Sequence, residues 1–85
     1  MPYITKKRRE MLNDWETPQN AGELNYLFTL TCKEYLECHG EKYATYNDII
    51  GALEGCKLEM YRRKIAPYED KKIQENGDVY DGTST

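Results

Sequence analysis

The residues with the clearest chemical potential in this sequence lie between positions 57 and 72. Cationic side chains alternate there with tyrosines, and the candidate ligand-binding residues are Lys57, Tyr61, Arg62, Arg63, Tyr68 and Lys72. Arginine guanidinium groups hold phosphates through paired hydrogen bonds, and tyrosine rings stack on nucleobases. The cluster therefore indicates a binding site for a small anionic, nucleotide-like ligand.

The same segment is also compatible with a plain solvated helix face. Carboxylates stand three or four residues from the cations, which is the spacing at which side chains meet on a helix. The pairs are Glu54 with Lys57, Glu59 with Arg62 or Arg63, and Lys71 with Glu75. Both interpretations stay open at the level of sequence.

No catalytic constellation accompanies this cluster. The single histidine, His39, neighbours Cys38 without further ligands at metal-binding spacing. Ser84 lies in the polar tail, and Glu69 and Asp70 are mixed with lysines as on a solvated surface. We expect a protein that is not an enzyme and that uses no cofactor and no metal.

Length and composition predict one small domain over residues 1–80, with a frayed polar tail at residues 81–85. A chain of 85 residues buries only about 60% of its unfolded surface, so we expect a homo-oligomer. Eight tyrosines against one phenylalanine suit interfaces and ligand-stacking walls. The net charge of −3 argues against general nucleic-acid binding, and we expect the basic run Lys6–Arg9 to be a solvated face.

The three cysteines include no CxxC pair, and their odd number favours free, mostly buried thiols. The N-terminus has no apolar signal region, and no stretch of the sequence is long and apolar enough to span a membrane. These observations together predict a cytoplasmic protein with no membrane contact.

One amphipathic helix, residues 45–66, organises the expected fold. Thr45 and Asp48 have the spacing of a capping box, and Pro67 should end or kink the helix. Apolar side chains recur every three or four residues, at Ile49, Leu53, Cys56 and Met60. Gly51 and Gly55 weaken a helix interior by about 1 kcal/mol each, which suggests that another backbone packs close to them.

Three further helical segments complete an all-α fold. A short helix over residues 5–15 should be held by docking of Trp15. Asn20, with Glu23 at the capping-box position, should begin a helix over residues 21–38 that stops near Gly40. A turn at residues 41–44 then gives an antiparallel helical hairpin. Residues 68–75 should add a helical turn or two that stops at Asn76-Gly77.

The segments AGELNYLFTLTCKEYL (residues 21–36) and NDIIGALEGCKLEMYRRKIAPYEDKKIQENGDVY (residues 47–80), with the opening PYI, resemble a small uncharacterised family carried by phages and prophages. The resemblance covers nearly the whole chain and implies a phage protein in a host bacterial cell. The architecture is more loosely similar to phage sponge proteins, which oligomerise and sequester immune signalling nucleotides.

That second resemblance implies an anti-defence sponge that binds a cyclic nucleotide or an ADP-ribose-type molecule without turning it over. The alternative is a helical protein-binding module that inhibits or regulates a host or phage protein. A third interpretation is a nucleic-acid-associated protein that uses the basic run Lys6–Arg9, although the acidic balance makes nucleic acid a poor candidate partner.

Overall fold

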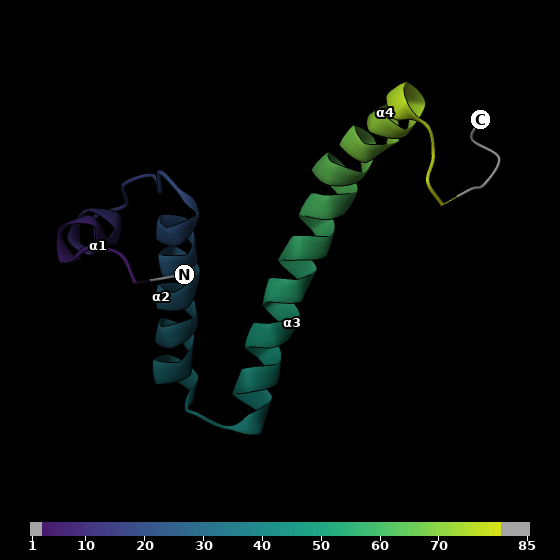
Figure 1. The fold of residues 1–85 in the computed structure, drawn as a ribbon. Coiled ribbons are helices and arrows are strands. Elements are labelled where there is room, and N and C mark those ends of the chain that lie inside the picture. Colours follow the sequence, from purple (N-terminus) through teal and green to yellow (C-terminus); the bar gives the residue numbers. More distant parts are fainter. Residues whose placement is uncertain (1–2, 81–85) are drawn as a thin grey trace. The chain divides into compact units, whose positions relative to one another are not determined.

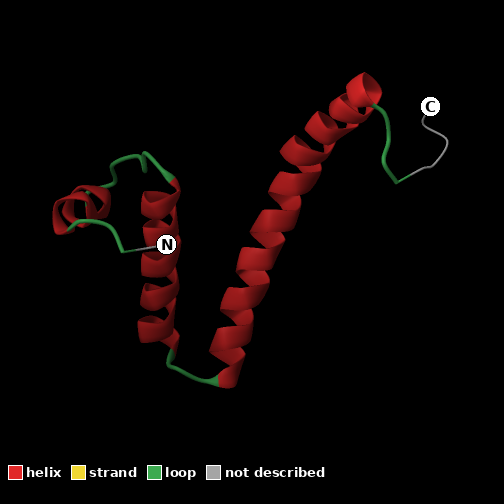
Figure 2. Ribbon diagram, in the orientation of Figure 1, coloured by secondary structure: helices red, strands yellow, loops and turns green. Residues whose placement is uncertain are grey.

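The computed structural model describes residues 3–80, which form helices joined by turns, with no strand in that range. The all-α prediction is therefore confirmed. The elements are α1 (Lys6–Asn13), α2 (Ala21–His39), α3 (Tyr43–Met60), a π-helical turn η1 (Tyr61–Ile65) and α4 (Ala66–Asn76) (Figures 1 and 2). The chain divides into two compact units, one up to Ile49 and one from Ile50 onward.

Helix α1 begins at Thr5, whose hydroxyl accepts a hydrogen bond of 3.2 Å from the backbone N–H of Arg8. It ends at Asn13 because the chain turns back at Trp15, which adopts a positive φ of 70°. Trp15 lies beyond the end of α1 and its side chain is 95% exposed, so the prediction that it docks α1 is wrong. Leu12, at 2% exposure, is the only buried hydrophobic residue among those described.

Helix α2 has the predicted start and stop. The Asn20 side chain accepts from the N–H of Glu23 at 2.9 Å and caps the first turn. Gly40 ends the helix with φ of 88°, a conformation that glycine adopts without steric cost, and its N–H donates to the Leu36 carbonyl.

Helix α3 starts two residues earlier than predicted. The carbonyl of Lys42 accepts from the N–H of Tyr46, so Thr45 is a buried residue of the first turn and not the N-cap. Asp48 accepts a 3.0 Å hydrogen bond from the Tyr35 hydroxyl on α2 instead of completing a capping box. Local spacing suggested the cap, but the helix begins before Thr45, and Asp48 bonds to a residue of another helix.

Pro67 was predicted to end or kink a helix over residues 45–66, but the regular α-helix α3 ends earlier, at Met60, and Pro67 lies in the first turn of α4. Proline lacks an N–H and its ring crowds the preceding turn, and the chain accommodates both by widening that turn into η1. The N–H of Ala66 donates to the Tyr61 carbonyl, five residues back. Helix α4 then runs, as predicted, to a stop at Gly77, where φ is 92°. The predicted tail, residues 81–85, lies outside the described residues.

Candidate functional site

The six candidate ligand-binding residues lie on one continuous helical segment. Lys57 is on α3, Tyr61, Arg62 and Arg63 are on η1, and Tyr68 and Lys72 are on α4. Successive helical residues are rotated by roughly 100°, so the three adjacent residues of η1 project to different sides. One helix cannot direct all six side chains toward a single ligand.

Three cations of this segment, Lys57, Arg62 and Arg63, are engaged in ion pairs, as the solvated-face interpretation predicted. Glu59 Oε1 accepts from Arg62 at 3.1 Å and from Arg63 at 2.8 Å, and Lys57 lies 3.4 Å from Glu54. Their side chains are all more than half exposed. Exposed pairs of this kind contribute little stability, so their charges stay accessible to an incoming anion.

One expected ion pair is replaced by another. Glu75 pairs with Lys72 at 3.2 Å and not with Lys71. The Lys72 ammonium also lies 5.6 Å from the centre of the Tyr68 ring, within cation–π range. Tyr68, Lys71, Lys72 and Glu75 together line a shallow hollow on α4. Of the six predicted site residues, Tyr68 and Lys72 are the two that line this hollow.

Tyr61 faces a carboxylate. Its hydroxyl donates to Glu69 on α4, and this hydrogen bond is the main cause that raises the pKa of Tyr61 above its ordinary value. Tyr61 therefore remains a neutral donor at neutral pH. Its ring is held along the helix by this bond, so stacking against a ligand requires the bond to break or the ligand to approach from the side.

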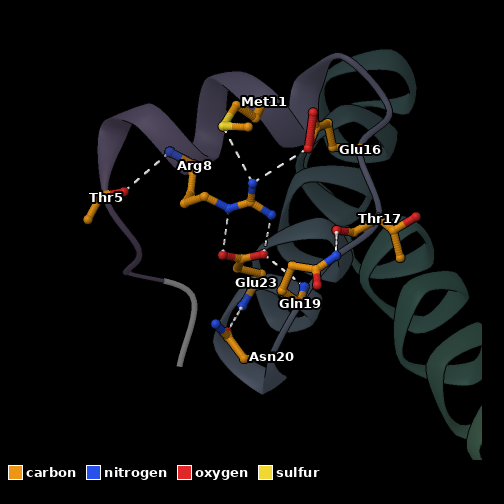
Figure 3. A network of polar contacts seen from close by, with 8 residues as sticks. All are labelled: Thr5, Arg8, Met11, Glu16, Thr17, Gln19, Asn20 and Glu23. Atoms are coloured by element: carbon orange, nitrogen blue, oxygen red, sulfur yellow. Dashed lines mark hydrogen bonds and ion pairs between the residues drawn. The ribbon is translucent and has the colours of Figure 1, made fainter.

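The most highly connected polar group lies elsewhere, at the junction of α1 and α2 (Figure 3). The Arg8 guanidinium donates to both oxygens of Glu23, from Nε at 2.7 Å and from Nη2 at 2.6 Å. Glu23 Oε1 also accepts from the backbone N–H of Gln19 at 2.8 Å. Arg8 Nη1 reaches the Met11 sulfur at 3.4 Å and lies 3.6 Å from Glu16.

This network was not predicted from the sequence. The sequence predicts that Arg8 belongs to a solvated basic run, and that Glu23 completes a capping box in which its side chain returns to Asn20. The carboxylate of Glu23 instead bonds to the N–H of Gln19, one residue earlier, and to an arginine fifteen positions away. Of the run Lys6–Arg9, Arg8 is the half-buried member, and helical spacing distinguishes it, because it stands four residues before the buried Leu12 on the same side of α1.

The Arg8–Glu23 pair acts as a structural clamp. Glu23 is only 5% exposed and both of its oxygens have donors. The hydrogen bonds from Arg8 and Gln19 lower the pKa of Glu23, and the hydrogen bond between Arg8 and Glu23 raises the pKa of Arg8. A carboxylate that is buried and bonded in this way serves a structural role, and it fixes α1 against α2.

The apolar stripe of α3, defined as Ile49, Leu53, Cys56 and Met60, forms no core. Ile49 is half-buried, Leu53 is 41% exposed, Met60 is 53% exposed and Cys56 is exposed. All three cysteines are free thiols, but the prediction that they are mostly buried is wrong. Cys38 and Cys56 are exposed, and Cys32 is half-buried.

The two helical glycines do not belong to this stripe. At roughly 100° per residue, Gly51 and Gly55 lie on the opposite side of α3 from Leu53 and Met60. A Cβ atom added at either glycine would meet no atom within 4 Å. Within the unit that follows Ile49, the close backbone approach predicted for them has no partner.

Comparison with protein families places the chain in a family defined by a domain of unknown function, DUF6899, whose model matches residues 1–79. The chain belongs to this family. No curated protein and no solved structure matches it.

Two further findings concern residues 3–80. No group of three or more histidine, cysteine, aspartate or glutamate side chains in that range is arranged to hold a metal ion. None of the helices formed there combines the length and the apolar character needed to cross a membrane.

Proposed function

We propose that this chain is a non-enzymatic binding protein that acts by docking the exposed apolar side of α3 against another protein chain. The observation that supports this proposal is the exposure of the apolar stripe. Hydrophobic burial is the main driving force of folding and association, and Leu12 is the only buried hydrophobic residue described. Apolar side chains that recur at helical spacing and are exposed to water are typical of a helix that binds in a groove of a partner or against a partner helix.

The sequestration of a small anionic, nucleotide-like ligand is a second candidate function. It is favoured by two arginines that share one carboxylate, Glu59, and so leave excess positive charge, and by the Tyr68–Lys72 hollow on α4. Because the six site residues surround one helix, a second subunit would have to complete the pocket. This proposal includes a homo-oligomeric sponge of phage type acting in the cytoplasm of a bacterial host.

The first function is tested by retention on immobilised chain. Wild type, Leu53→Glu and Leu58→Glu are coupled to separate matrices and exposed to bacterial lysate and to labelled copies of the chain. Leu58 is 56% exposed and lies across α3 from the stripe, so it is the matched control. We expect the wild type and Leu58→Glu to retain the same protein, whether another chain or a second copy, and Leu53→Glu to lose it. Equal retention by all three contradicts the proposal.

The second function is tested by calorimetric titration with cyclic dinucleotides, cyclic trinucleotides and ADP-ribose derivatives. A hydrogen bond to a charged group contributes roughly 1.5–3 kcal/mol, so Arg62→Ala or Arg63→Ala should weaken binding about tenfold to a hundredfold. Glu59→Gln, which releases both arginines, should strengthen it. The absence of binding to the wild type at micromolar concentrations contradicts the sponge proposal.

A further inference from the structure

We infer that the partner of the α3 surface is a second copy of this chain, lying antiparallel along α3, η1 and α4. The inference rests on the proposed function, since it names the occupant of the same surface. A two-fold pair of this kind is the commonest arrangement of homo-oligomers, because each copy presents the same patch to the other.

The distribution of charge supports the antiparallel direction. Helix α3 carries the carboxylates of Asp48, Glu54 and Glu59 against one cation, Lys57. The following segment, η1 with α4, has an excess of cations over its carboxylates, with Arg62, Arg63, Lys64, Lys71 and Lys72 against Glu69, Asp70 and Glu75. A parallel pair would place like charges together, whereas an antiparallel pair places the acidic half of one copy beside the basic half of the other.

These charges also set the register. The midpoint between the carboxylates of α3 and the cations of η1 and α4 falls near Met60, which places the two-fold axis there. Met60 then meets Met60 of the second copy, Leu53 lies near Tyr68, and Asp48 lies near Lys72. The contact between the two Met60 residues lies on the axis and is made once, and the other two contacts are each made twice because the arrangement is symmetric.

The π-helical turn continues the apolar stripe into α4. In an uninterrupted α-helix, Arg63 and Pro67 would follow Met60 on the stripe, three and seven residues later. The wide turn η1 takes up about one extra residue, and this brings Ile65 and Tyr68 into line with Leu53 and Met60. Ile65 is half-buried and Tyr68 is 54% exposed. Both halves of the long helical segment therefore have apolar groups to offer the other copy.

Distances between spin labels test this arrangement. The background is Cys32→Ser, Cys38→Ser and Cys56→Val, which keeps the stripe apolar. One label is placed at Tyr61→Cys, beside the proposed axis, and in a second variant at Lys71→Cys. With a rise of 1.5 Å per residue, labels at position 71 in the two copies should be separated by about 33 Å along the helix, and labels at position 61 by only a few ångströms along it.

A short distance at position 61 together with a long one at position 71 supports the inference. Equal distances at both positions indicate a parallel pair and overturn it, while leaving the proposed docking function in place. No dipolar coupling at either position indicates that the chain does not pair with itself, which also overturns it. In that case the proposed function depends on retention of a different protein by the immobilised chain.

Discussion

Replacement of Leu12 by alanine should release α1 from α2. Leu12 is 2% exposed and is the buried apolar contact of α1. Leucine-to-alanine changes at buried sites cost about 2–5 kcal/mol. Helix α1 has eight residues, fewer than the roughly 12–15 that an isolated helix needs to persist in water. Even the low end of this range, about 2 kcal/mol, corresponds to a change of roughly thirtyfold in the docking equilibrium.

Amide hydrogen exchange measures this release directly. The N–H of Arg9 donates to the Thr5 carbonyl at 3.0 Å in the first turn of α1, and its exchange should accelerate in Leu12→Ala. Amides in the middle of α2 should be affected much less, because that helix is capped at both ends. Leu58→Ala, at an exposed position of α3, is the control. Unchanged exchange at Arg9 in Leu12→Ala would refute the claim that this contact holds α1.

Three other predictions concern the clamp, the glycines and the tryptophan. Because the folded-state pKa of Glu23 lies below its ordinary value of 4.5, the stability that its carboxylate adds to the folded state is complete above about pH 4.5 and is lost as the pH falls through the lowered pKa. The NMR shifts of the Leu12 methyl groups should follow this loss, and Glu23→Gln should remove the pH dependence. Gly55→Ala should stabilise α3 by up to about 1 kcal/mol in a denaturant titration, since the added Cβ meets no atom within 4 Å, and a loss of stability would instead reveal a packed neighbour. Trp15, the only tryptophan, should emit as an indole in water and be quenched by iodide, whereas a shielded emission would contradict its exposure.

Features fixed by neighbouring residues were predictable from the sequence. Asn20 caps α2, and Gly40 and Gly77 end helices, because these effects depend on side chains and φ angles within one turn. Contacts between distant residues were not predictable in this way. Helical spacing puts Arg8 on the side of Leu12, but it does not indicate that the partner of Arg8 is Glu23, fifteen positions away. Thr45 resembles a cap although it is buried within the first turn of α3.

In the candidate site, too, contacts within one helical turn were predictable and the other features were not. The pairing of Glu59 with Arg62 and Arg63 follows from helical spacing and was predicted. The π-helical turn was not, because the sequence signal of Pro67 indicates only that a regular α-helix is disturbed. The alignment of Ile65 and Tyr68 with the stripe of α3, which we infer from this turn, depends on the number of residues in it and could not be predicted.

We propose that the apolar stripe of α3 is a docking surface and that a second copy of the chain occupies it. Sedimentation equilibrium of the wild type and Leu53→Glu tests it most directly, with circular dichroism to show that both chains are helical. We expect a wild-type mass of twice the 10.0 kDa chain, and a shift toward the single-chain mass in Leu53→Glu. A wild type that sediments as a single chain at every concentration, or a pair that Leu53→Glu leaves intact, would contradict it.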